Sequence, residues 1–419
     1  MTIKKNTYSA IVLLFLVTTT NYTCNVYAAN PDFLADQIKH RQTFTNNDHG
    51  EEGVKFSCGK EQLQDVEREM LAYLTRLGIP PTLVNHSFSA NAKSLIFQLA
   101  TPSGDVSTVD LRFRPEMEIS DQLVSLPSRH GNPTTVLTVS EKEIVLSLMQ
   151  HGRLTEFSGN QCRFQVFRDH VGIRQNIVAW AENVEWNWPD GKRAQWNKRY
   201  WKKGTPLPGV SLSKAVADAF LNQEKYSIGC YTATKLVMIH GVLDYYARIK
   251  NSPADVAEIE QRLMANDSDP LVQIESRAVW AFEEDFDASE LWQKGKLLEM
   301  RYNIPARNFV PGDWGYLLNT DPITAKKTGY EGSSAIYLGR GKFDDYYNDH
   351  NHSYLFREKL DEVYQWRNKV FSRRRDMAKV HPLTERDIEK LEATPEKGGL
   401  VMDMRVYFPP LSPRAPSVR

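Results

Sequence analysis

The stretch around which this chain is organised reads Tyr226-Ser227-Ile228-Gly229-Cys230-Tyr231-Thr232-Ala233-Thr234-Lys235. Its turn-forming Ser-Ile-Gly predicts that Cys230 enters the first turn of a helix. The apolar residues that follow recur at helical spacing and predict one buried face, made of Leu236, Val237, Ile239, Val242, Leu243 and Tyr246. A thiol at a helix start lies near the positive end of the helix dipole, which favours the nucleophilic thiolate. We therefore predict that Cys230 carries out covalent chemistry.

The length and charge of the chain limit the classes of protein to which it can belong. The 419 residues suffice for two domains of ordinary size. The 52 basic residues are matched by 52 acidic residues, so no positive excess indicates a nucleic-acid partner. After the N-terminus, no stretch is long and apolar enough for a membrane helix. We predict a soluble globular protein that binds no nucleic acid and has no stable membrane span.

The N-terminus has the pattern of a cleavable signal peptide. Lys4 and Lys5 precede an apolar run over residues 11–17, which is too short to span a bilayer. Small residues then allow cleavage after Ala28. We predict that residues 1–28 are removed and that the mature protein is secreted or periplasmic.

The number of cysteines fits this localisation. Cys24 leaves with the signal peptide, so Cys58, Cys162 and Cys230 remain in the mature chain. In an oxidising compartment an odd count leaves one thiol unpaired. Cys58 and Cys162 could pair and leave Cys230 free, whereas the alternative is three buried, inert thiols.

Residues 29–204 are predicted to form a small α+β domain built on an antiparallel sheet. A helix is expected over residues 61–77 and another over 171–184. Alternating or β-branched runs predict strands over residues 94–100, 107–113, 134–139, 144–149 and 163–168. The domain ends in a Trp-rich connector, residues 185–204, which contains four Trp among basic residues. This connector is either a recognition platform for sugar or peptide, or a linker whose aromatic residues fold back on the core.

The second half supplies three clusters that could assist Cys230. Helices are predicted over residues 212–222, 253–264, 288–300 and 357–374, and strands over 308–318 and 333–338. The first cluster, 309–316, contains a Pro-Gly-Asp turn in which Asp313 is expected to cap backbone amides. The second, 329–339, places Glu331 before an apolar strand, and the third, 345–353, contains His350 and His352. A cysteine nucleophile needs a base, and either histidine would serve.

These pieces, taken in order, resemble the small bacterial, spore-coat-type transglutaminases, which are protein-glutamine gamma-glutamyltransferases. The resemblance covers about residues 205–370. It consists of a Cys-Xaa-Thr-Ala segment beginning at Cys230, a Phe-Xaa-Pro-Gly-Asp-Xaa-Xaa-Tyr turn over 309–316, Glu331 before a strand that ends Leu-Gly, and a Tyr-Tyr…His segment over 346–350. It implies a papain/NlpC-P60-like cysteine transferase core in a catalytic domain over residues 205–375, followed by a C-terminal tail over 376–419. It also implies Cys230 as nucleophile, with Glu331 and His350 or His352 as its partners.

Three functions follow from these observations. The first is an exported acyltransferase that joins protein glutamine and lysine side chains, or deamidates glutamine, through a thioester on Cys230. The second is an NlpC/P60-like cysteine peptidase or amidase that acts on cell-wall peptides. The third is a non-catalytic secreted binding protein in which the connector binds the ligand and Cys230 is inert.

No cofactor is expected for any of these functions. One cluster of acidic and histidine side chains has ligands that a metal ion would accept, namely Asp344, Asp345, Asp349, His350 and His352. No matching distant cluster in the sequence completes a site. We therefore predict that the protein binds no metal.

Overall fold

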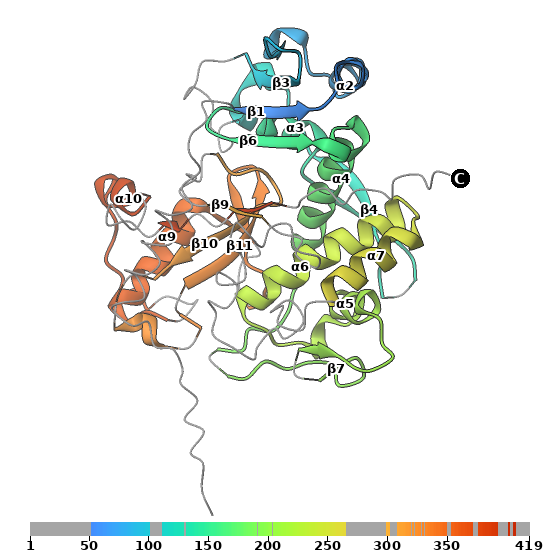
Figure 1. Cartoon of the computed structure of the whole chain (residues 1–419). Coiled ribbons are helices and arrows are strands. Elements are labelled where there is room, and N and C mark those ends of the chain that lie inside the picture. Colours follow the sequence, from blue (N-terminus) through green and yellow to red (C-terminus); the bar gives the residue numbers. More distant parts are fainter. Residues whose placement is uncertain are drawn as a thin grey trace, which may run out of the picture.

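Helices lie on both faces of a five-stranded sheet, and a four-stranded sheet with its own helix occupies one end of the molecule (Figure 1). The predicted α+β class is confirmed. The computed structural model describes residues 52–100, 111–129, 131–190, 192–202, 204–264, 299–301, 308–319, 321, 323–327, 329–330, 332–349, 353–371, 376–392, 401–402 and 405–407.

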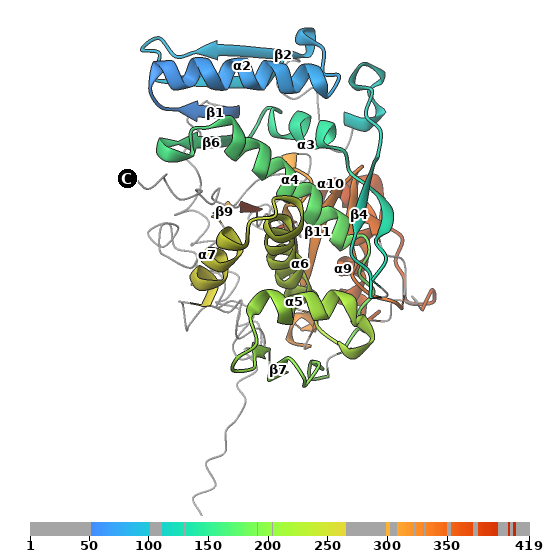
Figure 2. The same cartoon turned by 90° about the vertical axis from the view of Figure 1, so that its right-hand side faces the viewer.

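The four-stranded sheet has the order β2-β3-β1-β6. Its strands are β1 (Gly53–Ser57), β2 (Val84–Phe88), β3 (Ser94–Leu99) and β6 (Leu154–Ser158). The sheet is mixed rather than purely antiparallel as predicted, because β6 pairs with β1 in parallel. The predicted first helix is α2 (Lys60–Arg76), which packs on this sheet against β3 and is drawn in front of it in Figure 2. It buries one face, made of Leu63, Val66, Met70, Tyr73 and Leu74.

Two of the predicted strands in this half are wrong, because they belong to helices. Residues 144–149 fall in and after α3 (Glu141–Leu148), whose N-cap Ser140 accepts a hydrogen bond from the Glu143 amide. Residues 163–168 open α4 (Phe164–Ala181). Every residue of α3 from 143 to 148 is buried, and a helix buried on all sides shows no apolar period that separates it from a strand.

A hairpin of β4 (Gln122–Leu126) and β5 (Thr134–Thr138) packs against α4. The predicted strand over 134–139 is therefore confirmed. Of the predicted strand over 107–113, residues 111–113 form a 3₁₀ turn, and residues 107–110 lie outside the described residues.

The five-stranded sheet is antiparallel throughout and has the order β13-β12-β11-β10-β14. Its strands are β10 (Trp314–Leu318), β11 (Gly332–Gly339), β12 (Lys342–Asp344), β13 (Ser353–Leu355) and β14 (Val401–Met402). Helices α4 and α6 (Cys230–Asp244) pack against β11, and α9 (Phe356–Gln365) packs against β10 and β12 (Figure 1). The central strand β11 is buried along its whole length, as expected for a strand that is covered on both faces.

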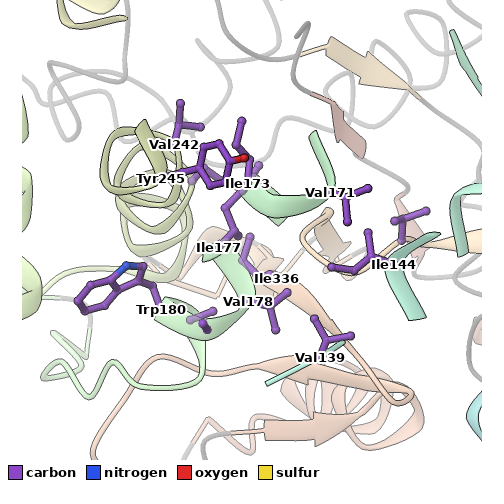
Figure 3. Packing of buried hydrophobic residues seen from close by; sticks show 14 of the residues in the cluster. Val139, Ile144, Val171, Ile173, Ile177, Val178, Trp180, Val242, Tyr245 and Ile336 are labelled. Atoms are coloured by element: carbon purple, nitrogen blue, oxygen red, sulfur yellow. The ribbon is translucent and has the colours of Figure 1, made fainter. Parts of the chain in front are cut away.

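The core is continuous between the two halves of the chain. One cluster of buried apolar side chains runs from Val54 to Tyr347. In it, Ile177 of α4, Val242 of α6 and Ile336 of β11 gather together (Figure 3). A Cβ on Gly241 would lie 2.3 Å from an Ile177 atom, so glycine permits α6 to approach α4 this closely. The predicted domain boundary between residues 204 and 205 thus separates two helices that share one core.

Three predicted helices of the second half are confirmed. The helix over 212–222 is α5 (Leu212–Leu221), the helix over 253–264 is α7 (Pro253–Met264), and the helix over 357–374 is α9. Helix α9 ends at Gln365, and a 3₁₀ turn follows it. Of the predicted helix over 288–300, residues 299–300 are instead part of a strand, and residues 288–298 lie outside the described residues. The remaining elements are a π-helix (Tyr245–Ile249), α10 (Glu385–Leu391), β7 (Trp201–Lys202), β8 (Thr205–Pro206), β9 (Glu299–Arg301) and β15 (Arg405–Tyr407).

The predicted C-terminal tail returns to the body of the protein. Its β14 pairs with β10, and its β15 pairs with β9. In the described part of the chain, no helix combines the length and the apolar character needed to cross a bilayer.

A disulfide bond joins Cys58, just after β1, to Cys162, just before α4, with their Cα atoms 6.1 Å apart. Cys230 is not disulfide-bonded. The pairing considered from the cysteine count is therefore confirmed, and the alternative of three unpaired thiols is wrong.

Candidate active site

Cys230 is the first residue of α6, as predicted. Gly229 precedes it as the N-cap in extended backbone, and the Gly229 carbonyl accepts the first helical hydrogen bond, from the Ala233 amide at 2.9 Å. The Cys230 side chain is partly exposed, although α6 is almost entirely buried from Thr232 to Leu243. Cys230 thus keeps some exposure on an otherwise buried helix, and it also packs against the hydrophobic core.

The start of α6 is attached to the segment that precedes His350. The Thr234 hydroxyl donates to the Cys230 carbonyl at 2.8 Å. The Tyr346 hydroxyl lies 2.8 Å from the same Thr234 oxygen. Tyr346 is fully buried, and burial together with the nearby Asp344 raises the pKa of its phenol well above the usual value, so the phenol stays protonated.

Aromatic rings and one cation line the start of α6. The Tyr231 ring lies 5.2 Å from the Trp314 ring of β10, measured between centroids. Lys235 is fully buried, and its ammonium nitrogen lies 4.4 Å from the centre of the Tyr231 ring. This is the geometry of a cation–π contact. Lys235 belongs to the stretch that opened the sequence analysis, but its burial was not foreseen, because a lysine in a helical pattern is ordinarily exposed.

The Trp-rich connector lies between the candidate segments. The Trp186 amide donates to the Tyr346 carbonyl at 2.8 Å, and the Trp186 carbonyl accepts from the Asn348 amide at 3.1 Å. Trp186 is fully buried, and its indole N–H donates to the Ala219 carbonyl at 2.8 Å. The connector is thus joined to the segment that leads to His350.

The next residue, Asn187, reaches the segment that leads to Cys230. Its side chain donates to the Tyr226 carbonyl at 3.2 Å and accepts from Asn348 Nδ2 at 3.0 Å. Its backbone forms a bridge with Ser227. One asparagine side chain therefore links the chain before the candidate nucleophile to the chain before a candidate base.

The four Trp residues of the connector all pack on the core. Two of them are buried and two are partly buried against the same cluster: Trp186 and Trp201, then Trp188 and Trp196. Of the two interpretations of this segment, the structure supports the one in which the aromatic residues fold back.

The other predicted site residues, Glu331, His350 and His352, lie outside the described residues. In the sequence, Glu331 directly precedes Gly332 of β11, and His352 directly precedes Ser353 of β13. Strands β11 and β13 both pair antiparallel with β12, so they run in the same direction. Tyr354 of β13 faces Phe343 of β12, which in turn faces Tyr337 of β11, so β13 begins level with the second half of β11 and not with its start at Gly332.

Asp313 has the structural role that the turn predicted. It is fully buried, and its carboxylate accepts from the Val310 amide at 2.7 Å. It also accepts from Arg153 at 2.6 Å and from Arg174 at 2.8 Å, and both of these guanidinium groups are buried as well. Arg174 donates in turn to His170, whose pKa burial lowers well below the usual value. The sequence carried no signal for these partners, because they lie far upstream in α4 and beside β6.

The acidic residues of the candidate metal cluster have local partners. Asp344 is fully buried and accepts from the Asp345 amide at 2.8 Å, and burial raises the pKa of its carboxyl well above the usual value. Asp345 pairs with the Lys359 ammonium at 3.1 Å. Among the described residues, no three His, Cys, Asp or Glu side chains are grouped to hold a metal ion.

Comparison with known proteins identifies the family. A family model described as protein-glutamine gamma-glutamyltransferase matches residues 119–350. Among solved structures, the chain is similar to a transglutaminase from Geobacillus stearothermophilus (without C-terminal extension), at 18% identity, over 58% of this chain and 93% of that chain, with a TM-score of 0.32. A search of curated proteins finds no match.

The family match begins upstream of the resemblance seen in the sequence, so it also includes α4 and the Trp-rich connector. Because it spans more than half of the chain and contains Cys230, the chain belongs to the protein-glutamine gamma-glutamyltransferase family and is an acyltransferase.

Proposed function

We propose that this acyltransferase joins protein glutamine and lysine side chains by isopeptide bonds, through a thioester on Cys230. The observation that carries the proposal is the position of this thiol. Cys230 forms no disulfide and is intermediate in exposure at the first residue of a buried helix, whereas Cys58 and Cys162 are bonded to each other. A thiol at a helix start is the kind that ionises readily.

The proposed reaction has two steps. The Cys230 thiolate attacks the carboxamide carbon of a glutamine side chain, the C–N bond breaks, and ammonia leaves after taking a proton. A lysine amine then attacks the thioester, loses a proton, and returns the thiolate. When water attacks instead, the product is glutamate. Covalent catalysis of this kind replaces one difficult amide exchange by two easier steps.

The groups proposed to assist the thiol rest on the pattern of the sequence. Glu331 and one of His350 and His352 are proposed to move the protons of the two steps. The first four amides of an α-helix have no acceptor within the helix, so those at the start of α6 are suited to stabilise the oxyanion. The substrates would be proteins that carry a reactive glutamine as donor or a lysine as acceptor. No step of the cycle needs a cofactor.

An amine-incorporation assay tests the proposal. The native protein should attach a fluorescent primary amine to a glutamine-bearing protein and release ammonia, and Cys230→Ala should do neither. A matched control is the double variant Cys58→Ser with Cys162→Ser, which removes the two disulfide-bonded cysteines and should keep the activity of its folded fraction. Incorporation that survives in Cys230→Ala would refute the proposal. Clearing of a cell-wall suspension without incorporation would instead support the peptidase alternative.

We also propose that the protein acts outside the cytoplasm. Two independent features support this: the signal-peptide pattern of residues 1–28 and the disulfide between Cys58 and Cys162, a bond that persists in oxidising compartments. N-terminal sequencing of the protein from its producing cells should begin at Ala29. An intact N-terminus on protein that remains in the cytoplasm would contradict the proposal.

A further inference from the structure

Tyr346 is held at three points. Its carbonyl accepts from the Trp186 amide at 2.8 Å, and its amide donates to the Asp344 carboxyl at 3.4 Å. Its hydroxyl contacts Thr234 of α6 at 2.8 Å. Because backbone and side chain are both attached, the position of this phenol is determined by the surrounding fold and not by its own rotamer freedom.

The direction of the hydroxyl contact can be assigned. A threonine hydroxyl carries one hydrogen, and Thr234 donates it to the Cys230 carbonyl. The hydrogen between Thr234 and Tyr346 must then come from the phenol. A hydrogen-bond chain therefore runs from the Tyr346 hydroxyl through Thr234 to the carbonyl of Cys230.

The backbone at Tyr346 is itself unusual. Its φ is 59°, in the left-handed region that residues other than glycine rarely adopt. Such a conformation persists only where the surrounding structure enforces it, and it is common at functional sites. Here the Asp344 carboxyl, which accepts from the amides of Asp345 and Tyr346, forms the turn that enforces it. From this turn the Tyr346 side chain reaches Thr234 of α6.

The Cys230 carbonyl shares one planar peptide unit with the Tyr231 amide. Fixing the carbonyl therefore fixes the direction of that amide, which is one of the first-turn donors of α6. Such donors favour the thiolate and would face the oxyanion. Orientation of the nucleophile and orientation of its stabilising amide are thus set by the same hydrogen-bond chain.

We propose that Tyr346 is a positioning residue for Cys230, acting through Thr234 to hold the peptide at the start of α6 in its reactive orientation. This rests on the proposed role of Cys230 as the nucleophile. It assigns a purpose to the first tyrosine of the Tyr346-Tyr347 pair that the family resemblance does not. Tyr346 itself would touch neither substrate nor the reacting atoms.

Removal of single hydroxyl groups tests the proposal. Tyr346→Phe and Thr234→Val each interrupt the chain and keep the shape of the side chain, whereas Thr234→Ser keeps the hydroxyl. The first two should lower kcat about tenfold with little change in KM, since a lost buried hydrogen bond of about 1.4 kcal/mol corresponds to that factor. The serine variant should retain most of the activity. The rate of Cys230 alkylation by iodoacetamide should shift to higher pH in the two interrupting variants.

Tyr245→Phe is the matched control. Tyr245 is also a buried tyrosine, with a 2.8 Å hydrogen bond to Asp169, but it lies beyond the far end of α6. Loss of this hydrogen bond in Tyr245→Phe should lower the free energy of unfolding and leave both kcat and the pH profile of Cys230 alkylation unchanged. The alkylation rate does not depend on the transferase reaction, so it distinguishes a failure of the proposed function from a failure of the positioning role. Activity in Cys230→Ala would refute the proposed function. Wild-type profiles and kcat in Tyr346→Phe and Thr234→Val, with Cys230→Ala inactive, would refute the positioning role alone.

Discussion

Replacing Asp313 by alanine tests the buried charge cluster that joins the two halves of the chain. The carboxylate is fully buried and holds two guanidinium groups that are themselves at most 1% exposed, those of Arg153 and Arg174. Removing one partner of a buried ion pair costs about 3–5 kcal/mol, because a charge is left without compensation. Here two charges are left, and the Val310 amide also loses its acceptor, so we expect the upper end, about 5 kcal/mol. That is a large fraction of the stability of an ordinary domain, which is about 5–15 kcal/mol.

Equilibrium urea unfolding followed by circular dichroism measures this loss. The control is Asp65→Ala, which removes a carboxylate paired with Arg68 at 2.6 Å, the same separation as between Asp313 and Arg153. The Asp65 pair is exposed on both sides, so its loss should cost at most about 1 kcal/mol. Asp313→Asn keeps the size and one acceptor oxygen and should fall between the two. A loss in Asp313→Ala no larger than that in Asp65→Ala would refute the reasoning, because burial would then have no effect on the pair.

Three further predictions concern pH, the connector and the disulfide. Burial lowers the pKa of His240 from 6.5 to about 4. The neutral, buried imidazole therefore contributes fully to the free energy of unfolding above pH 6.5, and this contribution, about 3 kcal/mol, is lost as the pH falls through 4. The fall in urea midpoint between about pH 7.5 and about pH 4.5 should be smaller in His240→Leu, and an equal fall would contradict the assignment. Asn187→Ala removes the side chain that links Asn348 to the chain before the nucleophile. It should cost about 1–2 kcal/mol and lower kcat more than it changes KM, while an unchanged kcat would show that the link does not position the site. Cys58→Ser removes the disulfide to Cys162, which closes a loop of 104 residues, and should lower the free energy of unfolding in urea by about 4 kcal/mol. A loss below about 1 kcal/mol would show that the disulfide does not restrict the unfolded chain as expected.

The features that the sequence predicted are those set by neighbours within a few positions. The helix that begins at Cys230 follows from a turn and an apolar period, and the period is visible because each turn of the helix repeats it. The capping role of Asp313 follows from a turn three residues long, since the amide it accepts from is that of Val310. The odd number of cysteines predicted a free thiol. Where burial was complete, as in α3, the period vanished and the predicted strand was wrong.

Only the tertiary structure decided which distant segments meet at the site. The link between Thr234 and Tyr346 spans 112 residues, and that between Arg174 and Asp313 spans 139. Such contacts depend on how α4, α6 and β11 pack in three dimensions. Contacts between residues so far apart produce no repeating pattern in the sequence from which they could be predicted. The same holds for Trp186, which was predicted to be part of a connector and is in fact buried, with hydrogen bonds to Tyr346 and Asn348 and to Ala219 of α5. The sequence by itself therefore determines local features such as helix starts and turns. Which of these features come together at the site is determined by the long-range packing of apolar faces.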